Sequence, residues 1–81
     1  MLDEKTRSLV AVGASITANC QPCLDYHATQ ARAHGAHEQE ISVAIEIGQQ
    51  VRRGAAGKMD RFASQLLGDE ALAVVSDCGC K

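Results

Sequence analysis

Aromatic residues are scarce in this 81-residue chain, which contains one Tyr, one Phe and no Trp. The interior therefore has to be built from Ala, Val, Ile and Leu, which suits closely packed helices. Proline is scarce too, with a single residue at position 22. A chain of this length forms one domain and buries only about 60% of its unfolded surface, so its own core is marginal.

Long hydrophobic runs are also missing. No stretch approaches the ~18 apolar residues that a membrane span needs, and the first residues lack the basic start and apolar run of a secretory signal. We therefore expect a cytoplasmic protein without a membrane partner. The formal net charge of −2 and a pI near 5.8 argue against a nucleic-acid partner as well.

The apolar residues that are present recur at helical spacing. A first helix is predicted over about residues 3–18, capped by Asp3, and a second over about residues 20–34. Asn19 is the candidate N-cap of the second helix, and Gly35 fits the left-handed position after its end. One face of the first helix carries Leu2, Leu9, Val12, Gly13 and Ile16.

A third helix is predicted to start at residues 37–40, where acidic side chains favour a helix N-terminus. Its apolar residues spread over roughly 200°, far wider than the ~100° stripe of a helix covered on one side. We expect this helix to be buried on two sides, one of them by another subunit. These residues are Ile41, Val43, Ala44, Ile45, Ile47, Gly48 and Val51.

The segment Gly54-Ala55-Ala56-Gly57 weakens the third helix and permits a turn. A short fourth helix is predicted after it, containing Met59 and Phe62 and ending near Gly68. The fold class expected is all-α, a compact antiparallel bundle of about four helices that assembles as a homo-oligomer. Residues 1–68 form the helical domain, and residues 69–81 form a C-terminal extension.

The motif that carries chemistry is Cys20-Gln21-Pro22-Cys23, followed four residues later by His27. At 100° per residue these two thiols and the imidazole share one face of the second helix. Pro22 suits the first turn, and the positive end of the helix dipole stabilises a thiolate there. A histidine one turn after Cys23 can take the thiol proton or pair with the anion. The pattern indicates a reactive dithiol with a base beside it.

Other interpretations of the four cysteines remain open. In a reducing compartment, catalytic or metal-binding thiols are favoured over a disulfide framework. Cys20, Cys23, Cys78 and Cys80 could form a four-thiolate zinc site, or a regulatory oligomer could bind a soft metal through them. Cys20 and Cys23 could also be small buried hydrophobes, and His27 a packed core histidine.

The sequence around the Cys-x-x-Cys motif excludes a c-type haem site and a thioredoxin fold. Attachment of a c-type haem needs His directly after the second Cys, where this chain has Leu24. A thioredoxin fold needs a strand before the motif and a second proline facing it, and neither is present.

His34 and His37 flank Gly35, where helix-capping roles are favoured over metal ligation. No cofactor or resident metal is expected.

The end of the chain carries a second dithiol, Cys78-Gly79-Cys80. A dithiol near a chain end can reach a disulfide that larger reductants cannot. We therefore consider an auxiliary redox role, in which this pair passes electrons to Cys20 and Cys23. A terminal thiol pair without a role is equally compatible with the sequence.

The order of these features resembles the AhpD-like branch of the carboxymuconolactone decarboxylase superfamily. The features are a long helix, then Cys-x-x-Cys with a His four residues on, then a helix that ends at Gly and an apolar helix that starts with acidic residues. The resemblance covers about residues 5–67. It implies an all-α homo-oligomer that reduces peroxides or passes electrons to a peroxiredoxin. It also implies that Cys23 attacks peroxide, Cys20 resolves the intermediate and His27 relays the proton.

The chain departs from this pattern at two positions. The family usually has a relay Glu twelve residues before the first Cys, where this chain has Ser8, and AhpD itself has a His where this chain has Pro22. Glu4, one turn before Ser8, is a candidate substitute. Loss of the carboxylate slows proton delivery, which favours thiol–disulfide exchange over efficient peroxide turnover.

The sequence therefore predicts a thiol-dependent oxidoreductase. Its substrate is a peroxide or a protein disulfide, and its cycle needs an external thiol reductant whose identity the sequence does not specify. An oligomerisation module whose redox pair has no substrate is the third alternative.

Overall fold

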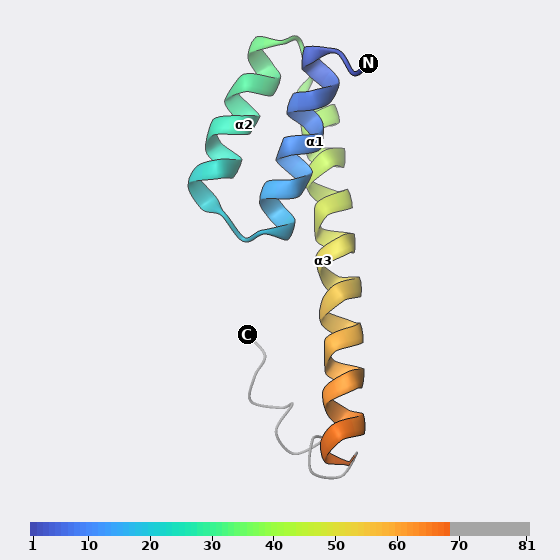
Figure 1. The fold of residues 1–81 in the computed structure, drawn as a ribbon. Helices are drawn as coiled ribbons and strands as arrows, with labels where there is room; N and C mark the ends of the chain where they lie inside the picture. The colour runs from blue at the N-terminus through green and yellow to red at the C-terminus, as the bar shows by residue number, and fades with distance from the viewer. Residues whose placement is uncertain (69–81) are drawn as a thin grey trace.

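The computed structural model describes residues 1–68, and these residues form three helices (Figure 1). The helices are α1 (Glu4–Thr17), α2 (Gln21–Ala33) and α3 (Glu38–Leu67), and the described residues contain no strand. α1 and α2 run antiparallel as a hairpin, while α3 lies along α1 and continues well past its end. The all-helical class is confirmed. No helix within residues 1–68 is long and apolar enough to cross a membrane.

The predicted boundary between a third and a fourth helix is wrong. α3 runs without a break through Gly54-Ala55-Ala56-Gly57, so the described part of the chain has three helices rather than about four. A glycine in a helix interior costs about 1 kcal/mol relative to alanine, but it keeps its backbone N–H and does not break the hydrogen-bond ladder. The two alanines between the glycines have the highest helix propensity of any residue.

The core of this small fold is made of short side chains, as the near absence of aromatics requires. Val12 on α1 and Ala31 on α2 are fully buried, and Ile41 on α3 is almost so. The other buried hydrophobic residues are Ala28, Ala36 and Ala44. With so little volume at the contact, the helix backbones approach closely.

Gly13 on α1 and Gly48 on α3 lie at a close approach of the two helix backbones. A Cβ placed on Gly48 would collide with the carbonyl oxygen of Gly13 and lie 2.9 Å from Cβ of Ile16. The Thr17 hydroxyl donates to the carbonyls of both glycines, at 3.2 Å for Gly13 and 3.1 Å for Gly48. This contact fixes how α3 lies on α1.

Gly48→Ala should therefore destabilise the fold by about 1–3 kcal/mol, the usual cost of forcing extra volume into a packed contact. Gly13→Ala is the matched control, because its Cβ would meet only the Ala44 carbonyl oxygen, at 3.2 Å. Denaturant unfolding of the two variants should give a clearly larger loss for Gly48→Ala. Equal losses would show that the two helices do not meet in this way.

Carboxylate side chains accept backbone amides at the N-termini of α1 and α3. Asp3 accepts the Thr6 amide at 2.8 Å. The Thr6 side chain, and after it this amide bond, lower the pKa of Asp3. Glu40 accepts the His37 amide at 2.8 Å and pairs with Lys5 at 3.1 Å. The bond from His37, and after it the bond from Lys5, lower the pKa of Glu40. Arg32 bonds to Glu38 at 2.6 and 3.1 Å and lowers the pKa of Glu38.

These depressed pKa values predict a loss of stability in acid. A carboxyl group with a lower pKa in the folded state contributes stability above its unfolded pKa, and the contribution is lost as pH falls through the folded value. The ordinary values are 3.8 for Asp3 and 4.5 for Glu38 and Glu40. The thermal midpoint should therefore fall between about pH 5 and pH 3. Asp3→Asn should reduce that fall, and an unchanged slope would exclude a contribution from this cap.

Candidate redox site

The turn between α1 and α2 places the first cysteine of the motif. The Asn19 amide donates to the Ile16 carbonyl at 3.1 Å, and the Cys20 amide donates to the Ser15 carbonyl at 3.0 Å. Asn19 has φ 57°, the only positive φ of a non-glycine residue within residues 1–68. This pair of bonds around a left-handed residue is a Schellman ending, and Asn tolerates that conformation better than most residues. Gly35 takes the corresponding left-handed role after α2, with φ 95°, as predicted.

Cys20 then serves as the N-cap of α2, so the prediction of Asn19 for that position is wrong by one residue. Asn19 is used instead to end α1. The Cys20 sulfur accepts the Cys23 amide at 3.3 Å, which is the bond that an N-cap side chain normally makes. Pro22 lies in the first turn, as predicted.

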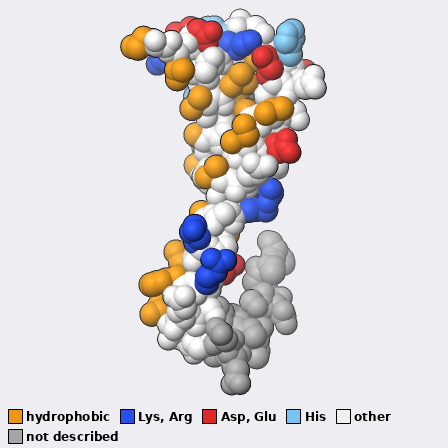
Figure 2. All heavy atoms as spheres, turned by 90° about the vertical axis from the view of Figure 1, so that its right-hand side faces the viewer, with side chains coloured by type: hydrophobic (Ala, Val, Ile, Leu, Met, Phe, Trp, Pro, Cys, Tyr) orange, Lys and Arg blue, Asp and Glu red, His pale blue; other side chains and the backbone are white. Residues whose placement is uncertain are grey.

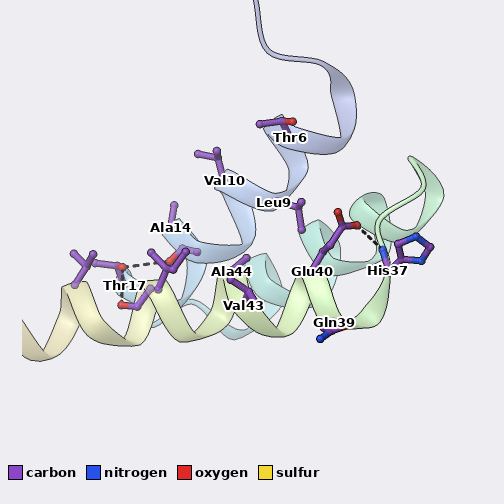
Figure 3. Close-up of a pocket in the computed structure, with 14 residues that line it drawn as sticks. Thr6, Leu9, Val10, Ala14, Thr17, His37, Gln39, Glu40, Val43 and Ala44 are labelled. Carbon is purple, nitrogen blue, oxygen red and sulfur yellow. Dashed lines mark hydrogen bonds between the residues drawn. The ribbon is translucent and has the colours of Figure 1, made fainter.

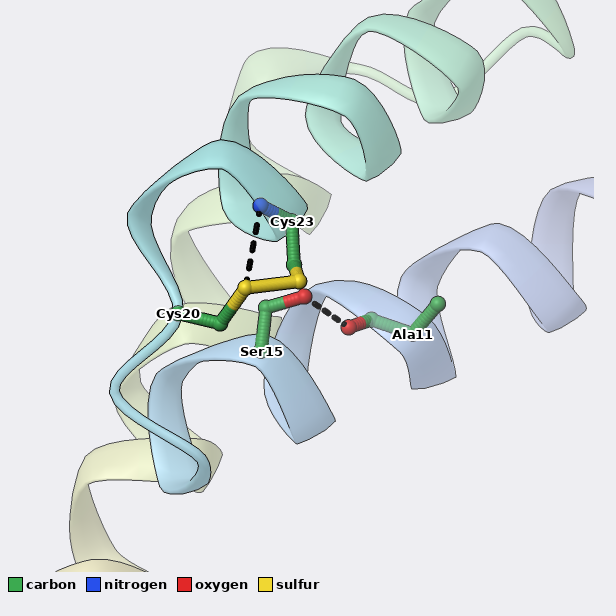
Figure 4. Close-up of a disulfide and its surroundings, with 4 residues drawn as sticks. All are labelled: Ala11, Ser15, Cys20 and Cys23. Atoms are coloured by element: carbon green, nitrogen blue, oxygen red, sulfur yellow. Dashed lines mark hydrogen bonds between the residues drawn. A yellow bond between two sulfur atoms is a disulfide. The ribbon is translucent and has the colours of Figure 1, made fainter.

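Cys20 and Cys23 are joined as a disulfide, with their Cα atoms 5.2 Å apart (Figure 4). Both residues are half-buried. The pair therefore lies within bonding reach at a helix N-terminus, partly open to solvent. In the reduced protein the Cys23 amide and the helix dipole would both stabilise a thiolate at Cys20.

His27 lies one turn after Cys23 on α2 and is also half-buried. Its ring packs edge-on against the ring of Tyr26, with the centroids 5.0 Å apart. Residues four apart on a helix are neighbours on one face, so the imidazole and the Cys23 sulfur share the edge of the α2 face that packs on α1. His27 is therefore not a fully buried core histidine. His34 and His37 are exposed and act as the C-cap of α2 and the N-cap of α3.

Ser15 is a residue of the site that the sequence reasoning missed. It is buried on α1, and its side chain points toward the disulfide in Figure 4. Its hydroxyl donates to the Ala11 carbonyl at 2.7 Å. The signal that could have identified it is the spacing of Ser8, Val12 and Ser15, which line the face of α1 that packs in the fold.

Ser8, at the position of the usual relay Glu, is buried on that same face of α1. It lies seven residues before Ser15, which corresponds to about 10 Å along the helix axis. Glu4 is exposed in the first turn of α1. Figure 4 shows the Ser15 hydroxyl beside the disulfide.

Arg52 of α3 anchors the turn that carries Cys20. Its Nη1 donates to the Ile16 carbonyl at 3.1 Å and to Asn19 Oδ1 at 2.8 Å. The guanidinium thus bonds both to the end of α1 and to the left-handed residue before the first cysteine. Sequence reasoning did not assign Arg52 this role, because the two partners lie more than thirty positions away.

Arg52→Ala should destabilise the fold by about 1–2 kcal/mol, since it removes two charge-assisted hydrogen bonds from a half-buried site. It should also make the Cys20–Cys23 bond easier to open, because the turn is held less firmly. Arg53→Ala, at the exposed neighbouring position, is the control and should change stability by less than about 0.5 kcal/mol. Urea unfolding and dithiothreitol titration measure the two effects, and identical behaviour of the two variants would exclude the anchoring role.

The tail cysteines Cys78 and Cys80 lie outside the described residues. In the part of the chain that the structure describes, no three His, Cys, Asp or Glu side chains cluster closely enough to hold a metal ion. The four-thiolate set suggested by the sequence has only its first pair in that part.

Comparison with known proteins identifies the family. Residues 1–59 match the model of the carboxymuconolactone decarboxylase family. The chain belongs to this family. The match spans α1, α2 and most of α3, and it includes Cys20, Cys23 and His27. Membership is consistent with an AhpD-like protein, in a superfamily that includes decarboxylases and peroxidases.

One curated relative comes from Paracoccus denitrificans and carries the name "Uncharacterized protein 4 in cox locus". It is 36% identical to this chain over 55 residues, which are 68% of this chain and 50% of the relative. The chain thus spans about half the length of the curated relative it matches. No solved structure gives a significant match.

Proposed function

We propose that the protein is a thiol-dependent oxidoreductase that cycles between a Cys20/Cys23 dithiol and a Cys20–Cys23 disulfide. The observation that carries the proposal is the pairing of these cysteines at the start of α2, with His27 one turn further on the same helix edge. A dithiol so close to a helix N-terminus has a stabilised thiolate and a partner sulfur in reach. Family membership is compatible with this chemistry, and the motif favours it over decarboxylation.

The oxidative half of the cycle starts at Cys23. His27 accepts the thiol proton, and the Cys23 thiolate attacks one oxygen of a hydroperoxide. The O–O bond breaks, Cys23 becomes a sulfenic acid, and the leaving alkoxide or hydroxide takes the proton from His27. The Cys20 thiolate then attacks the Cys23 sulfur and displaces hydroxide, which leaves as water once it is protonated. Two electrons have passed from the two thiols to the peroxide.

With a disulfide as the oxidant, the same residues act without a sulfenic acid. One thiolate attacks the substrate disulfide to form a mixed disulfide, and the second cysteine displaces the substrate thiol. In either case an external thiol reductant must reopen the Cys20–Cys23 bond. On reopening, Cys20 is the better leaving group, because the Cys23 amide and the helix dipole stabilise its thiolate.

Assays with two oxidants test the proposal. Protein at micromolar concentration should accelerate the consumption of cumene hydroperoxide, or the reduction of insulin disulfides, in the presence of dithiothreitol. The Cys78→Ser/Cys80→Ser variant is the control that assigns the activity to Cys20 and Cys23. This variant should retain the activity when dithiothreitol is the reductant. Rates no faster than those of dithiothreitol alone with both oxidants would contradict the proposal.

The tail dithiol enters the proposal only as an electron carrier from a protein reductant. If it has that role, Cys78→Ser/Cys80→Ser should slow reduction by a protein such as thioredoxin and leave reduction by dithiothreitol unchanged. A wild-type rate with the protein reductant would remove the tail from the cycle.

A further inference from the structure

Ser15 is a buried polar side chain that the proposed cycle does not use. Its exposed fraction is 5%, and its hydroxyl lies beside the disulfide in Figure 4. A backbone bond fixes the same neighbourhood, since the Cys20 amide donates to the Ser15 carbonyl at 3.0 Å. When the disulfide opens, a thiolate therefore forms next to a hydroxyl that solvent reaches poorly. Hydrogen bonds are stronger in such a place than in water.

α1 carries four hydroxyl side chains, and their positions single out Ser15. At 100° per residue, Thr6 and Thr17 lie on the opposite side of the helix from Ser15. Both line the open groove between α1 and α3 (Figure 3), and Thr17 is bonded there to two carbonyls. Ser8 shares the face of Ser15 but lies about 10 Å before it along the helix axis. Ser15 is thus the α1 hydroxyl that is placed at the redox pair.

The hydrogen bond that Ser15 makes in the oxidised protein can be given up. Its hydroxyl donates to the Ala11 carbonyl at 2.7 Å. That carbonyl is also the regular acceptor of the Ser15 amide in the helix, so it keeps a partner when the hydroxyl turns away. A hydrogen bond to an ionised acceptor is roughly twice as strong as one between neutral groups. A thiolate should therefore draw the hydroxyl away from the carbonyl.

The two sulfurs differ in their need for a donor. The Cys20 sulfur accepts the Cys23 amide at 3.3 Å, as the N-cap of α2. Among the hydrogen bonds of residues 1–68, none ends on the Cys23 sulfur. In the proposed cycle His27 takes the proton of Cys23 and leaves a negative charge on this sulfur. A donor on α1 would stabilise that charge from the other side.

The charged donors of the described helices are engaged elsewhere. Lys5 and Arg32 form ion pairs with carboxylates of α3, and Arg52 is bound to the end of α1 and to Asn19. Three further basic residues follow Arg52 along α3, and Figure 2 shows basic side chains along this part of the molecule. They are Arg53, Lys58 and Arg61. Within residues 1–68 the donor that the fold places at the pair is therefore a neutral hydroxyl.

We propose that the Ser15 hydroxyl donates a hydrogen bond to the Cys23 sulfur of the reduced protein and so favours its thiolate. The inference rests on the proposed function, since it concerns the same redox pair. As His27 accepts the Cys23 proton, the hydroxyl turns from the Ala11 carbonyl to the sulfur. Ser15 keeps its own proton, and no covalent bond to it forms or breaks. α1 thereby supplies a donor at the reacting sulfur, in a chain that has Ser8 where the usual relay carboxylate would be.

The first test reads the Cys23 thiolate without any peroxide or disulfide substrate. In the Cys20→Ala/Cys78→Ser/Cys80→Ser protein, Cys23 is the only thiol, and the alanine brings no new hydroxyl to its side. The rate of alkylation by iodoacetamide from pH 5 to pH 10 follows the thiolate fraction. Adding Ser15→Ala should lower the rate at pH 7 by about tenfold and move the midpoint of the profile to higher pH, because a bond to the charged form is lost. The rate at pH 10 should be unchanged.

Ser8→Ala is the matched control. Ser8 is a buried serine on the same face of α1, 9% exposed against 5% for Ser15, and it lies two helical turns away from the pair. Its replacement should leave the alkylation profile unchanged, and circular dichroism should show that both serine variants keep their helices. A Ser15→Ala profile that coincides with that of the parent protein would overturn the proposal. An equal displacement by Ser8→Ala would also overturn it, because a general loosening of α1 would then explain both.

The second test keeps Cys20 and the N-cap of α2 in place. After reduction of the Cys78→Ser/Cys80→Ser protein and brief alkylation at pH 7, mass spectrometry should find less alkylated Cys23 when Ser15→Ala is added, with Cys20 little changed. A loss at Cys20 alone would assign the hydroxyl to the other sulfur and overturn the proposal. If Cys23 shows the expected dependence on Ser15 while the protein consumes neither peroxide nor insulin disulfides, this inference stands and the proposed function fails.

Discussion

Cys23→Ser should reduce the rate of peroxide reduction by at least about 10³-fold, because a serine hydroxyl at this position has no thiolate to offer and forms no sulfenic acid. The measurement is single-turnover consumption of cumene hydroperoxide by the pre-reduced Cys78→Ser/Cys80→Ser protein, with and without the additional change. The fold should be unaffected, since Cys23 is only half-buried and its amide remains available to cap α2.

Cys20→Ser provides the matched comparison. This variant should still consume one equivalent of peroxide but stop there, with a sulfenic acid on Cys23 that dimedone traps and mass spectrometry locates. The serine hydroxyl can still accept the Cys23 amide as an N-cap, so α2 keeps its start. If the Cys23→Ser protein instead consumed one equivalent of peroxide and formed a sulfenic acid on Cys20, the assigned roles of the two thiols would be reversed.

His27→Gln should lower the single-turnover rate at pH 7 by about 10²-fold, the lower end of what a positioned general base contributes. The deficit should shrink as pH rises toward about 8.5, where an ordinary thiol ionises without help. This change with pH separates a proton-transfer role from a structural one, since a packing defect would not be repaired by alkali.

His34→Gln is the control for His27→Gln. His34 is exposed at the end of α2 and outside the contacts of the redox pair. Its replacement should leave both the rate and its pH profile unchanged. Equal effects of the two substitutions, or a His27→Gln deficit that stays constant from pH 7 to pH 9, would contradict a relay role for His27.

The helical hairpin could be predicted from the sequence because its signals are local. Asp3 before the first helix, Pro22 in the first turn of α2 and Gly35 after its end act within a few residues. The pairing of Cys20 with Cys23 follows from their spacing on one helix turn. Family membership, inferred from the same motif, is confirmed by the match over residues 1–59.

The features that could not be predicted depend on contacts between residues distant in the sequence, or on small free-energy differences between alternative local structures. Asn19 and Cys20 are both plausible N-caps, and the choice is made by the Schellman ending of α1. Whether Gly54 and Gly57 break a helix depends on about 1 kcal/mol each, which residue preferences alone do not decide. Ser15 and Arg52 gain their roles only when α1 packs between α2 and α3.

The measurement that tests the redox account most directly is disulfide mapping after addition of one equivalent of peroxide to the reduced, metal-free, full-length protein. Mass spectrometry of the alkylated digest should find Cys20 joined to Cys23, formed within seconds and reversed by dithiothreitol. If both thiols remain free to alkylation while peroxide persists, and a protein disulfide such as insulin also fails to oxidise them, then Cys20 and Cys23 are not a redox pair and the account is wrong.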